Sequence, residues 1–200
     1  MQQATAAANK PLTPGTELEG GYFAGIININ GQQFGIVVAP KEGDLDDQEW
    51  GPRQGLNGTT SFFDGHANTQ AMAEAGSELA KAIQALTING FTDWYLPARD
   101  ELELIYRYLK PTTDENWRFR GDNPSSVPVG YAYSAGTPSQ TPVTSFQEDG
   151  EQAMERAWYW SSTQYSANSA WLQYFDDGYQ DDVHKHDAFR ARAVRRFLIN

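Results

Sequence analysis

The sequence contains no cysteine. This absence excludes disulfide bonds, thiolate metal sites and a cysteine nucleophile. A chain without cysteine is compatible with any redox compartment, so the location of the protein stays open on this ground.

Long apolar runs are also missing, and positive charge is scarce. The longest apolar stretches, such as GIVVAP, are far shorter than the roughly 20 residues of a membrane span. The opening MQQATAAANKPLTPGTE has no basic region followed by an apolar run, so we expect neither a signal peptide nor membrane insertion. The 26 acidic residues outnumber the 15 Lys and Arg, and the net charge of −11 repels phosphate backbones. A nucleic-acid partner is therefore not expected.

Catalytic motifs are missing as well. Neither Gly-x-Ser-x-Gly nor a phosphate-cradling loop occurs in the chain. Carboxylates are numerous, but a glycosidase needs two of them held about 5–10 Å apart, which a sequence does not show. We expect a protein that is not an enzyme, with no catalytic residues and no cofactor. A carboxylate-based glycan hydrolase remains a third alternative.

The residues that are present predict a β-hairpin and a helix in the first half. Two β-rich runs in GYFAGIININGQQFGIVVAP flank Asn30 and Gly31, a pair that tolerates the positive φ of a tight turn. A helix is predicted next, with Asn68 or Thr69 as its cap. Its apolar residues recur at a spacing of three to four: Met72, Ala75, Leu79, Ile83 and Leu86.

A second helix and a long irregular segment follow. Asn89 and Gly90 are predicted to stop the first helix, and Pro97 can open another, which Pro111 ends. One face of this second helix carries Leu102, Ile105, Tyr106 and Leu109. Residues 111–155 are rich in Pro, Ser, Thr, Gly and Asp and are too long for an ordinary connection, which indicates an insertion or a surface excursion.

The pattern as a whole predicts an α+β fold. Short strands are expected at both ends of the chain, with two helices packed on short antiparallel strands and a loop-rich insertion. We expect residues 1–19 to be a flexible lead or attachment segment, because their first part is rich in Ala, Gln, Thr and Pro and has no periodicity. Residues 20–200 are expected to form one domain.

Three blocks of sequence resemble a known family. DWYLPARDELELIY, WYWSSTQYSANSAW and RARAVRRF are similar to hallmark blocks of the Lcl C-terminal domain family, which is found in phages and bacteria and has a C-type-lectin-like fold. The resemblance covers roughly residues 20–200. It implies that the N- and C-terminal strands pair, that helices pack against the sheet, and that a long loop region carries ligand contacts.

The last forty residues resemble the variable region of proteins diversified by retroelements, such as the phage major tropism determinant. In such proteins, mutated asparagine-type codons give Asp but never Glu, and His but never Gln. Between Tyr165 and Phe189 the chain has five Asp and no Glu, whereas its remaining acids are 9 Asp and 12 Glu. Trp171, Gln173, Gln180 and Lys185 cannot arise from such codons. We interpret residues 165–189 as a variable ligand-binding region, although Asp is also favoured in turns.

This region has the composition of a binding surface, since aromatic side chains supply contact area while Asp and His supply directional polar contacts. Strand alternation predicts that Trp171, Gln173 and Phe175 face the core. The expected ligand contacts are Tyr165, Ser169, Leu172, Tyr174, Asp176, Asp177, Tyr179, Asp181, Asp182, Val183, His184, His186, Asp187 and Phe189.

Two charged clusters have alternative readings. His184 and His186 are two residues apart and would project to one side of a strand, but no third neutral ligand accompanies them, so we predict no metal site. Calcium binding by DDGYQDD stays open, although the spacing is not that of an EF-hand. The arginines near the C-terminus are expected to pair with the abundant acids and to rigidify the base of the variable loops: Arg190, Arg192, Arg195 and Arg196.

The sequence therefore predicts a receptor-binding protein. Its expected partner is a protein or glycan receptor on a cell surface, with phage tail proteins as further candidates, and the resemblance suggests a homotrimer. Its expected location is a virion tail or a cell surface. The leading alternative is a structural assembly module of a virion or cell surface that has the same fold and a fixed surface.

Overall fold

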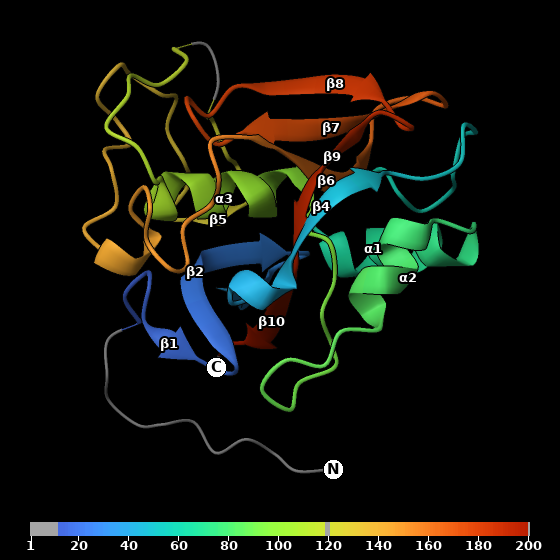
Figure 1. The fold of residues 1–200 in the computed structure, drawn as a ribbon, viewed down its shortest axis with the longest axis horizontal. Helices are drawn as coiled ribbons and strands as arrows, with labels where there is room; N and C mark the ends of the chain where they lie inside the picture. The colour runs from blue at the N-terminus through green and yellow to red at the C-terminus, as the bar shows by residue number, and fades with distance from the viewer. Residues whose placement is uncertain (1–11, 119–120, 200) are drawn as a thin grey trace.

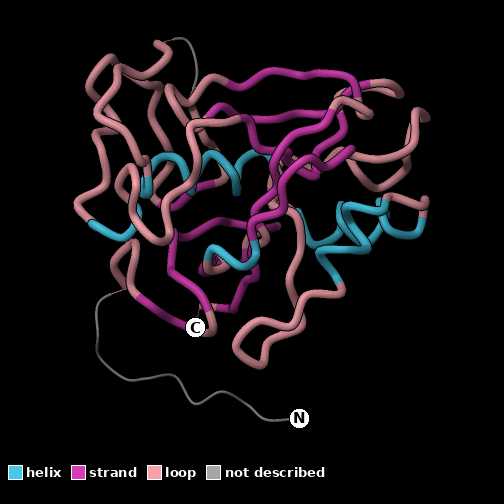
Figure 2. Tube along the Cα trace, viewed as in Figure 1, coloured by secondary structure: helices cyan, strands magenta, loops and turns pink. Residues whose placement is uncertain are grey.

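The computed structural model describes residues 12–118 and 121–199 and has a mixed α+β fold (Figures 1 and 2). Of the lead predicted over residues 1–19, residues 1–11 lie outside the described residues, and Glu17–Leu18 forms a strand that pairs within the first sheet. The strands form two curled sheets that are almost entirely antiparallel. The α-helices of the described part are α1 Gly65–Glu74, α2 Glu78–Gln84 and α3 Arg99–Leu109.

The first sheet contains the predicted hairpin. Asn30 and Gly31 have φ of 52° and 88°, which places both turn residues in the left-handed region. The sheet has the order β1-β2-β3-β10, and β5 pairs with β2. Its strands are β1 Glu17–Leu18, β2 Gly21–Ile29, β3 Gln32–Val38, β5 Ser126–Val127 and β10 Val194–Leu198. Because β10 pairs with β3, the expected pairing of N- and C-terminal strands is confirmed.

The second sheet carries the predicted variable region. It has the order β4-β9-β6-β7-β8, so β7 is flanked on both sides and β8 is an edge strand. Figure 1 shows β7 and β8 on the side of the molecule away from the first sheet. Its strands are β4 Asp44–Glu49, β6 Trp158–Gln164, β7 Ser169–Tyr174, β8 Gln180–His184 and β9 Ala188–Arg192.

Two short segments of chain join the sheets. The chain passes from β3 through a 3₁₀ turn, η1 Lys41–Gly43, into β4, and from β9 through Ala193 into β10. Backbone hydrogen bonds join the two crossings: Ala39 donates to the Ala193 carbonyl and Ala193 to the Gly43 carbonyl. The C-terminal strand of the first sheet is therefore a direct continuation of the second sheet.

The predicted first helix is in fact two helices. Gly76 has a φ of +96°, and the Ser77 side chain accepts from the Ala80 backbone, so one helix ends and another begins within the expected span. The cap of α1 is Asp64, whose carboxylate accepts from the Ala67 backbone at 3.1 Å. The predicted cap Asn68 is instead buried inside the helix.

Helix α3 lies between the two sheets and contacts β2 of one and β6 and β7 of the other. Its start is organised by Glu101, which is fully buried. One carboxylate oxygen accepts from the Ala98 backbone at 2.7 Å and the Gly65 backbone at 3.1 Å, and the other from the Tyr95 hydroxyl at 2.8 Å. The pKa of Glu101 is nevertheless raised to about 7, because the effect of burial outweighs the lowering by these hydrogen bonds.

Two apolar clusters fill the spaces around the sheets. The first gathers residues of β2, β3 and α3, including Ile27 and Tyr106, together with Phe146 of the irregular segment. The second gathers residues of α1, α2 and the second sheet, including Trp160, together with Trp94 and Leu96 of the segment before α3. No helix in the described ranges combines the length and apolar character of a membrane span.

The insertion predicted over residues 111–155 is a long irregular segment that lies beside α3 (Figure 2). In its described part it contains β5 and a 3₁₀ turn, η2 Thr144–Phe146. Buried Asn116 ties it together, because its amide group donates to the carbonyls of Ser134, Ala135 and Pro138. The segment is therefore packed against the body of the molecule.

Candidate functional site

Four aromatic side chains form a continuous row at one end of the second sheet. We call Trp117, Trp158, Tyr174 and Tyr179 the aromatic ridge. Trp158 stacks on Tyr174 with ring centres 5.0 Å apart, and Tyr179 meets Trp158 at 6.0 Å and Trp117 at 5.1 Å. Trp117 is 45% exposed, and the other three are half-buried. The ridge therefore offers a large, rigid aromatic surface to a ligand.

Two carboxylates accompany the ridge. Asp177 follows β7 and accepts from the Tyr179 backbone at 2.9 Å, and it lines a hollow of about 290 Å³ together with Trp117. Asp181 lies opposite Leu172 in the sheet and two residues beyond Tyr179 on β8, so it projects to the same face as Tyr179. Predicted residues Tyr174, Tyr179, Asp177 and Asp181 thus come together.

A second group of predicted residues lies at the opposite end of the β7–β8 pair. A hollow of about 350 Å³ opens there between the turn after β6 and the turn after β8. Its lining residues are Ser166, Asn168, Ser169, Asp182, Val183, His184 and Asp187. The predicted set is therefore divided between the two ends of the hairpin.

Tyr165 belongs to neither group. It packs edge-on against Trp171, which also meets Phe62 and lies 4.8 Å from the Arg99 guanidinium. Tyr165 and Phe62 are 57% and 41% exposed. Sequence reasoning missed Phe62 and Arg99 in this cluster, and it assigned Trp171 to the core, whereas Trp171 is only half-buried. The adjacent Phe62 and Phe63 in the glycine-rich loop before α1 were the sequence feature that could have indicated an aromatic cluster here.

Two predicted contacts need correction, because Leu172 and Ser169 are buried, whereas Asp176 and Phe189 are half-buried. Leu172 is 2% exposed, because it lies on a central strand opposite Trp160 and within the second apolar cluster, so it is not a ligand contact. Phe189 packs edge-on against Trp160 at 5.2 Å and is half-buried. Asp176 is bound to Arg156 at 2.7 Å, and burial raises its pKa.

The two histidines lie side by side, as their spacing predicted. The rings of His184 and His186 are nearly parallel with centres 5.8 Å apart. The Arg53 Nε donates to His186 Nδ1 at 2.7 Å. Within the described residues, no group of three or more His, Asp or Glu side chains is placed to hold a metal ion.

Four polar residues of the variable region are buried: Ser169, Gln180, Lys185 and Gln173, the last as strand alternation predicted. Gln173 donates to the Gly178 carbonyl at 3.2 Å, and Gln180 donates to the Gln173 side chain at 3.5 Å. Lys185 is 0% exposed. Gln173 and Gln180 anchor the turn between β7 and β8, and Lys185 anchors the turn between β8 and β9.

The contacts of Lys185 are all with neutral groups. Its ammonium donates to the Gln54 carbonyl at 2.8 Å and to the Gln164 amide oxygen at 2.7 Å, and it lies 4.6 Å from the Trp50 ring centre. Burial lowers the pKa of Lys185 to about 8. Because the Lys185 side chain bonds both to Gln54, in the loop before α1, and to Gln164, at the end of β6, it fixes the position of the turn between His184 and His186.

The C-terminal arginines pair with acids, as predicted. Arg192 is buried and reaches Asp44 at 3.2 Å across the second sheet. The other pairs are Arg190 with Asp46 at 3.0 Å, Arg195 with Asp93 and Glu19 at 2.7 Å each, and Arg196 with Asp64 at 2.8 Å. These charge-assisted bonds tie β9 and β10 to β4, α1 and the first sheet.

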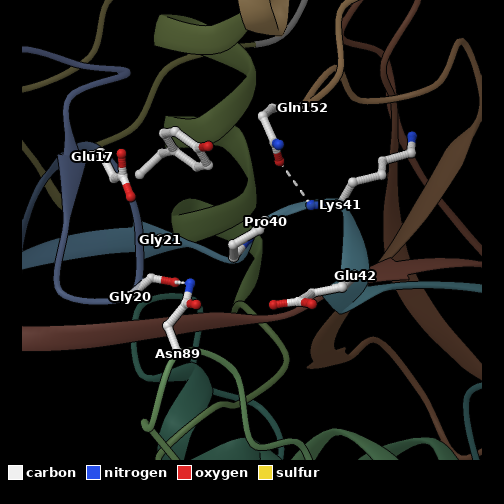
Figure 3. A pocket seen from close by; sticks show the side chains of 9 residues that line it. Glu17, Gly20, Gly21, Pro40, Lys41, Glu42, Asn89 and Gln152 are labelled. Carbon is white, nitrogen blue, oxygen red and sulfur yellow. Dashed lines mark hydrogen bonds between the residues drawn. The ribbon is translucent and has the colours of Figure 1, made fainter.

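Two other hollows lie outside the two ends of the β7–β8 hairpin. One of about 570 Å³ is mainly apolar and includes Phe62, Phe63 and Pro124, with the buried Asp100 beside them. The other, of about 280 Å³, lies at the first sheet. Figure 3 shows Glu17 and Glu42 on opposite sides of it while Lys41 extends away. None of the predicted contacts lines either hollow.

Comparison with known proteins identifies the family. The model of the Lcl C-terminal domain matches residues 49–195. No curated protein matches the chain significantly. A crystal structure of a fimbrial protein from Bacteroides ovatus aligns with 80% of this chain and 35% of its own, at 13% identity and a TM-score of 0.45. The match over most of the chain, which includes the ridge residues and the predicted contacts, shows that the protein belongs to the Lcl C-terminal domain family.

Proposed function

We propose that the chain is a non-enzymatic receptor-binding protein of C-type-lectin-like fold, with the ridge end of the β7–β8 hairpin as its binding face. The pairing of β10 with β3 and the family membership support this fold. The proposed receptor is a protein or glycan on a cell surface. The proposed setting is a virion tail or the surface of a cell.

One observation carries the proposal: the division between fixed and exposed residues in the segment 165–189. Three of the four residues that mutated asparagine-type codons cannot give, Gln173, Gln180 and Lys185, are buried and hold the turns on either side of β8, and the fourth, Trp171, is half-buried. Between them, Tyr174, Tyr179 and the aspartates reach solvent at least in part. Such a division suits a segment whose exposed side chains change while its backbone stays in place.

The physical properties of the ridge suit binding. Rigid aromatic anchors lose little rotamer entropy on binding and dominate the affinity of many interfaces. The arginine pairs beneath β9 and β10 hold the face in one arrangement, which lowers the ordering cost of association. Several copies on one particle would multiply a weak single contact.

Attachment to cells tests the binding face. The double variant Tyr174→Ala/Tyr179→Ala should lose attachment to cells of the strain that carries the gene or hosts its phage, and Tyr131→Ala, an exposed tyrosine elsewhere, should retain it. Full attachment by the double variant refutes the proposal. If the double variant instead loses only copurification with particle proteins, the protein is an assembly module.

The DNA beside the gene tests diversification. The proposal expects a near-copy of the codons for residues 158–196 that differs mainly at adenines, next to a reverse-transcriptase gene. Sibling clones should then differ mainly between residues 165 and 189. Without such a copy, the binding face is fixed, and the diversified part of the proposal is wrong.

A further inference from the structure

We infer that the aromatic ridge selects a ligand segment that carries arginine or lysine side chains, and thus a basic segment of a partner protein. This inference rests on the proposed function and names the chemistry of its receptor. Three observations support it: the rings themselves, the carboxylates beside them, and the way in which the chain holds its own arginines.

The rings of the ridge are suited to a cation. Tryptophan and tyrosine faces attract guanidinium and ammonium groups, and tryptophan does so most strongly. Trp158, Tyr174 and Tyr179 meet at different angles, so the row presents ring faces in more than one direction. Among the described residues, no arginine or lysine lies over any of these three rings.

The carboxylates of the ridge are available as well. Asp177 accepts from the Tyr179 backbone and Asp181 from the Asp182 backbone, each through only one oxygen. Neither forms an ion pair with a cation in the part of the chain that the structure describes. By contrast, the neighbouring Asp176 is held by Arg156. Charge complementarity at the ridge therefore favours a cation.

The chain itself provides the precedent for this chemistry. Four of its arginines each lie over an aromatic ring and form an ion pair with a carboxylate: Arg99 with Asp100, Arg107 with Glu103, Arg195 with Asp93, and Arg196 with Asp64. The Arg107 guanidinium, for example, is 4.6 Å from the Tyr131 ring centre and 2.7 Å from Glu103. The ridge repeats the same combination of ring and carboxylate at the surface.

The net charge favours the same partner at longer range. A charge of −11 raises the encounter rate with a basic segment and opposes an anionic glycan. A neutral glycan could stack on the rings but would leave the carboxylates without a cation. The combination of rings and carboxylates therefore points to a basic protein segment.

Peptide titration tests the inference. The probe is a peptide of four arginines separated by Gly-Ser, and its control has citrulline, which keeps the shape and removes the charge. We expect the arginine peptide to quench or shift the tryptophan fluorescence and the citrulline peptide to bind at least about tenfold more weakly. Added salt should weaken the arginine peptide further. Equal binding of both peptides overturns the inference.

Matched charge variants locate the binding. Asp177→Asn/Asp181→Asn keeps the oxygens that accept the backbone hydrogen bonds, and we expect it to weaken the arginine peptide by about tenfold. The control is Glu74→Gln/Glu78→Gln on exposed helical positions, which removes the same charge and should change the affinity less than twofold. If both double variants weaken binding of the arginine peptide equally, the effect comes from net charge alone and the inference is overturned.

The cell attachment assay separates this inference from the proposed function. If Tyr174→Ala/Tyr179→Ala abolishes attachment to cells while Asp177→Asn/Asp181→Asn does not, the binding face stands and its preference for cations is refuted. If the tyrosine variant attaches normally while the arginine peptide binds as expected, the cation preference stands and the proposed function is refuted.

Discussion

Replacing Lys185 with methionine tests whether a buried charge holds the turn after β8, at the end of the β7–β8 pair opposite the aromatic ridge. The ammonium lies among a carbonyl, an amide oxygen and the Trp50 ring, and burial lowers its pKa from 10.5 to about 8. Because the folded pKa lies below the unfolded one, the unfolded chain binds more protons between these values, and stability rises with pH there. Below pH 8 the folded state bears the cost of a buried charge.

The magnitude follows from the two pKa values. Between pH 7 and pH 9.5, proton linkage at this one group should add about 2 kcal/mol to the free energy of unfolding of the wild type. Lys185→Met has no such group, so its stability relative to the wild type should fall by about 2 kcal/mol over the same interval. Contributions from the other titrating groups are common to both proteins and cancel in the comparison.

Urea unfolding followed by tryptophan fluorescence provides the measurement. Both proteins are unfolded at pH 7 and pH 9.5, and the difference between their free energies of unfolding is compared at the two values. A difference that does not change with pH would refute the reasoning, because it would mean that Lys185 titrates alike in the folded and unfolded chains. An exposed control, Lys81→Met, should show no change.

The remaining predictions concern α3, β7 and the turn after β7. Burial raises the pKa of Glu101 to about 7, so the wild type should lose about 2 kcal/mol of stability between pH 5 and pH 8 relative to Glu101→Gln; equal pH profiles in urea unfolding would contradict this. Leu172→Ala should cost about 2–4 kcal/mol in chemical denaturation, and Tyr174→Ala should cost less; the reverse order would show that Leu172 is not a core residue. Gly178→Ala should lower the thermal midpoint by several degrees, because Gly178 has a φ of +79° and an added Cβ would collide with Tyr106; an unchanged midpoint would argue against this turn.

Local signals in the sequence were sufficient for part of the fold. Asn30 and Gly31 specify the hairpin turn through their own backbone preferences, so the prediction needed no knowledge of distant contacts. The arginines near the C-terminus were predicted to pair with acids because acids are abundant in the chain and the planar guanidinium forms charge-assisted bonds with them. The identity of their partners, such as Asp44 for Arg192, depends on the topology and was not predictable.

The rest depended on tertiary packing. The break between α1 and α2 requires Gly76 to adopt a positive φ, whereas the apolar spacing runs through it without interruption. Strand parity predicted that Leu172 and Tyr174 project from the same face of the sheet, and they do. It did not predict that Leu172 is buried, because large side chains of neighbouring strands cover one end of that face. Trp117 joins the ridge from the irregular segment, and no local pattern indicates a contact between residues about sixty positions apart.

The direct continuation of β9 into β10 limits how the binding face can change. The segment that follows the face must reach both sheets in a fixed register, since Tyr159 pairs with Arg190 and Val38 with Val194. An inserted residue in β9 would reverse the faces of every side chain up to the crossing. Variation of this face is therefore confined to exchange of side chains at constant length, unlike binding loops that also vary in length. A library built on this chain should keep the length of residues 165–198 and change only the exposed side chains.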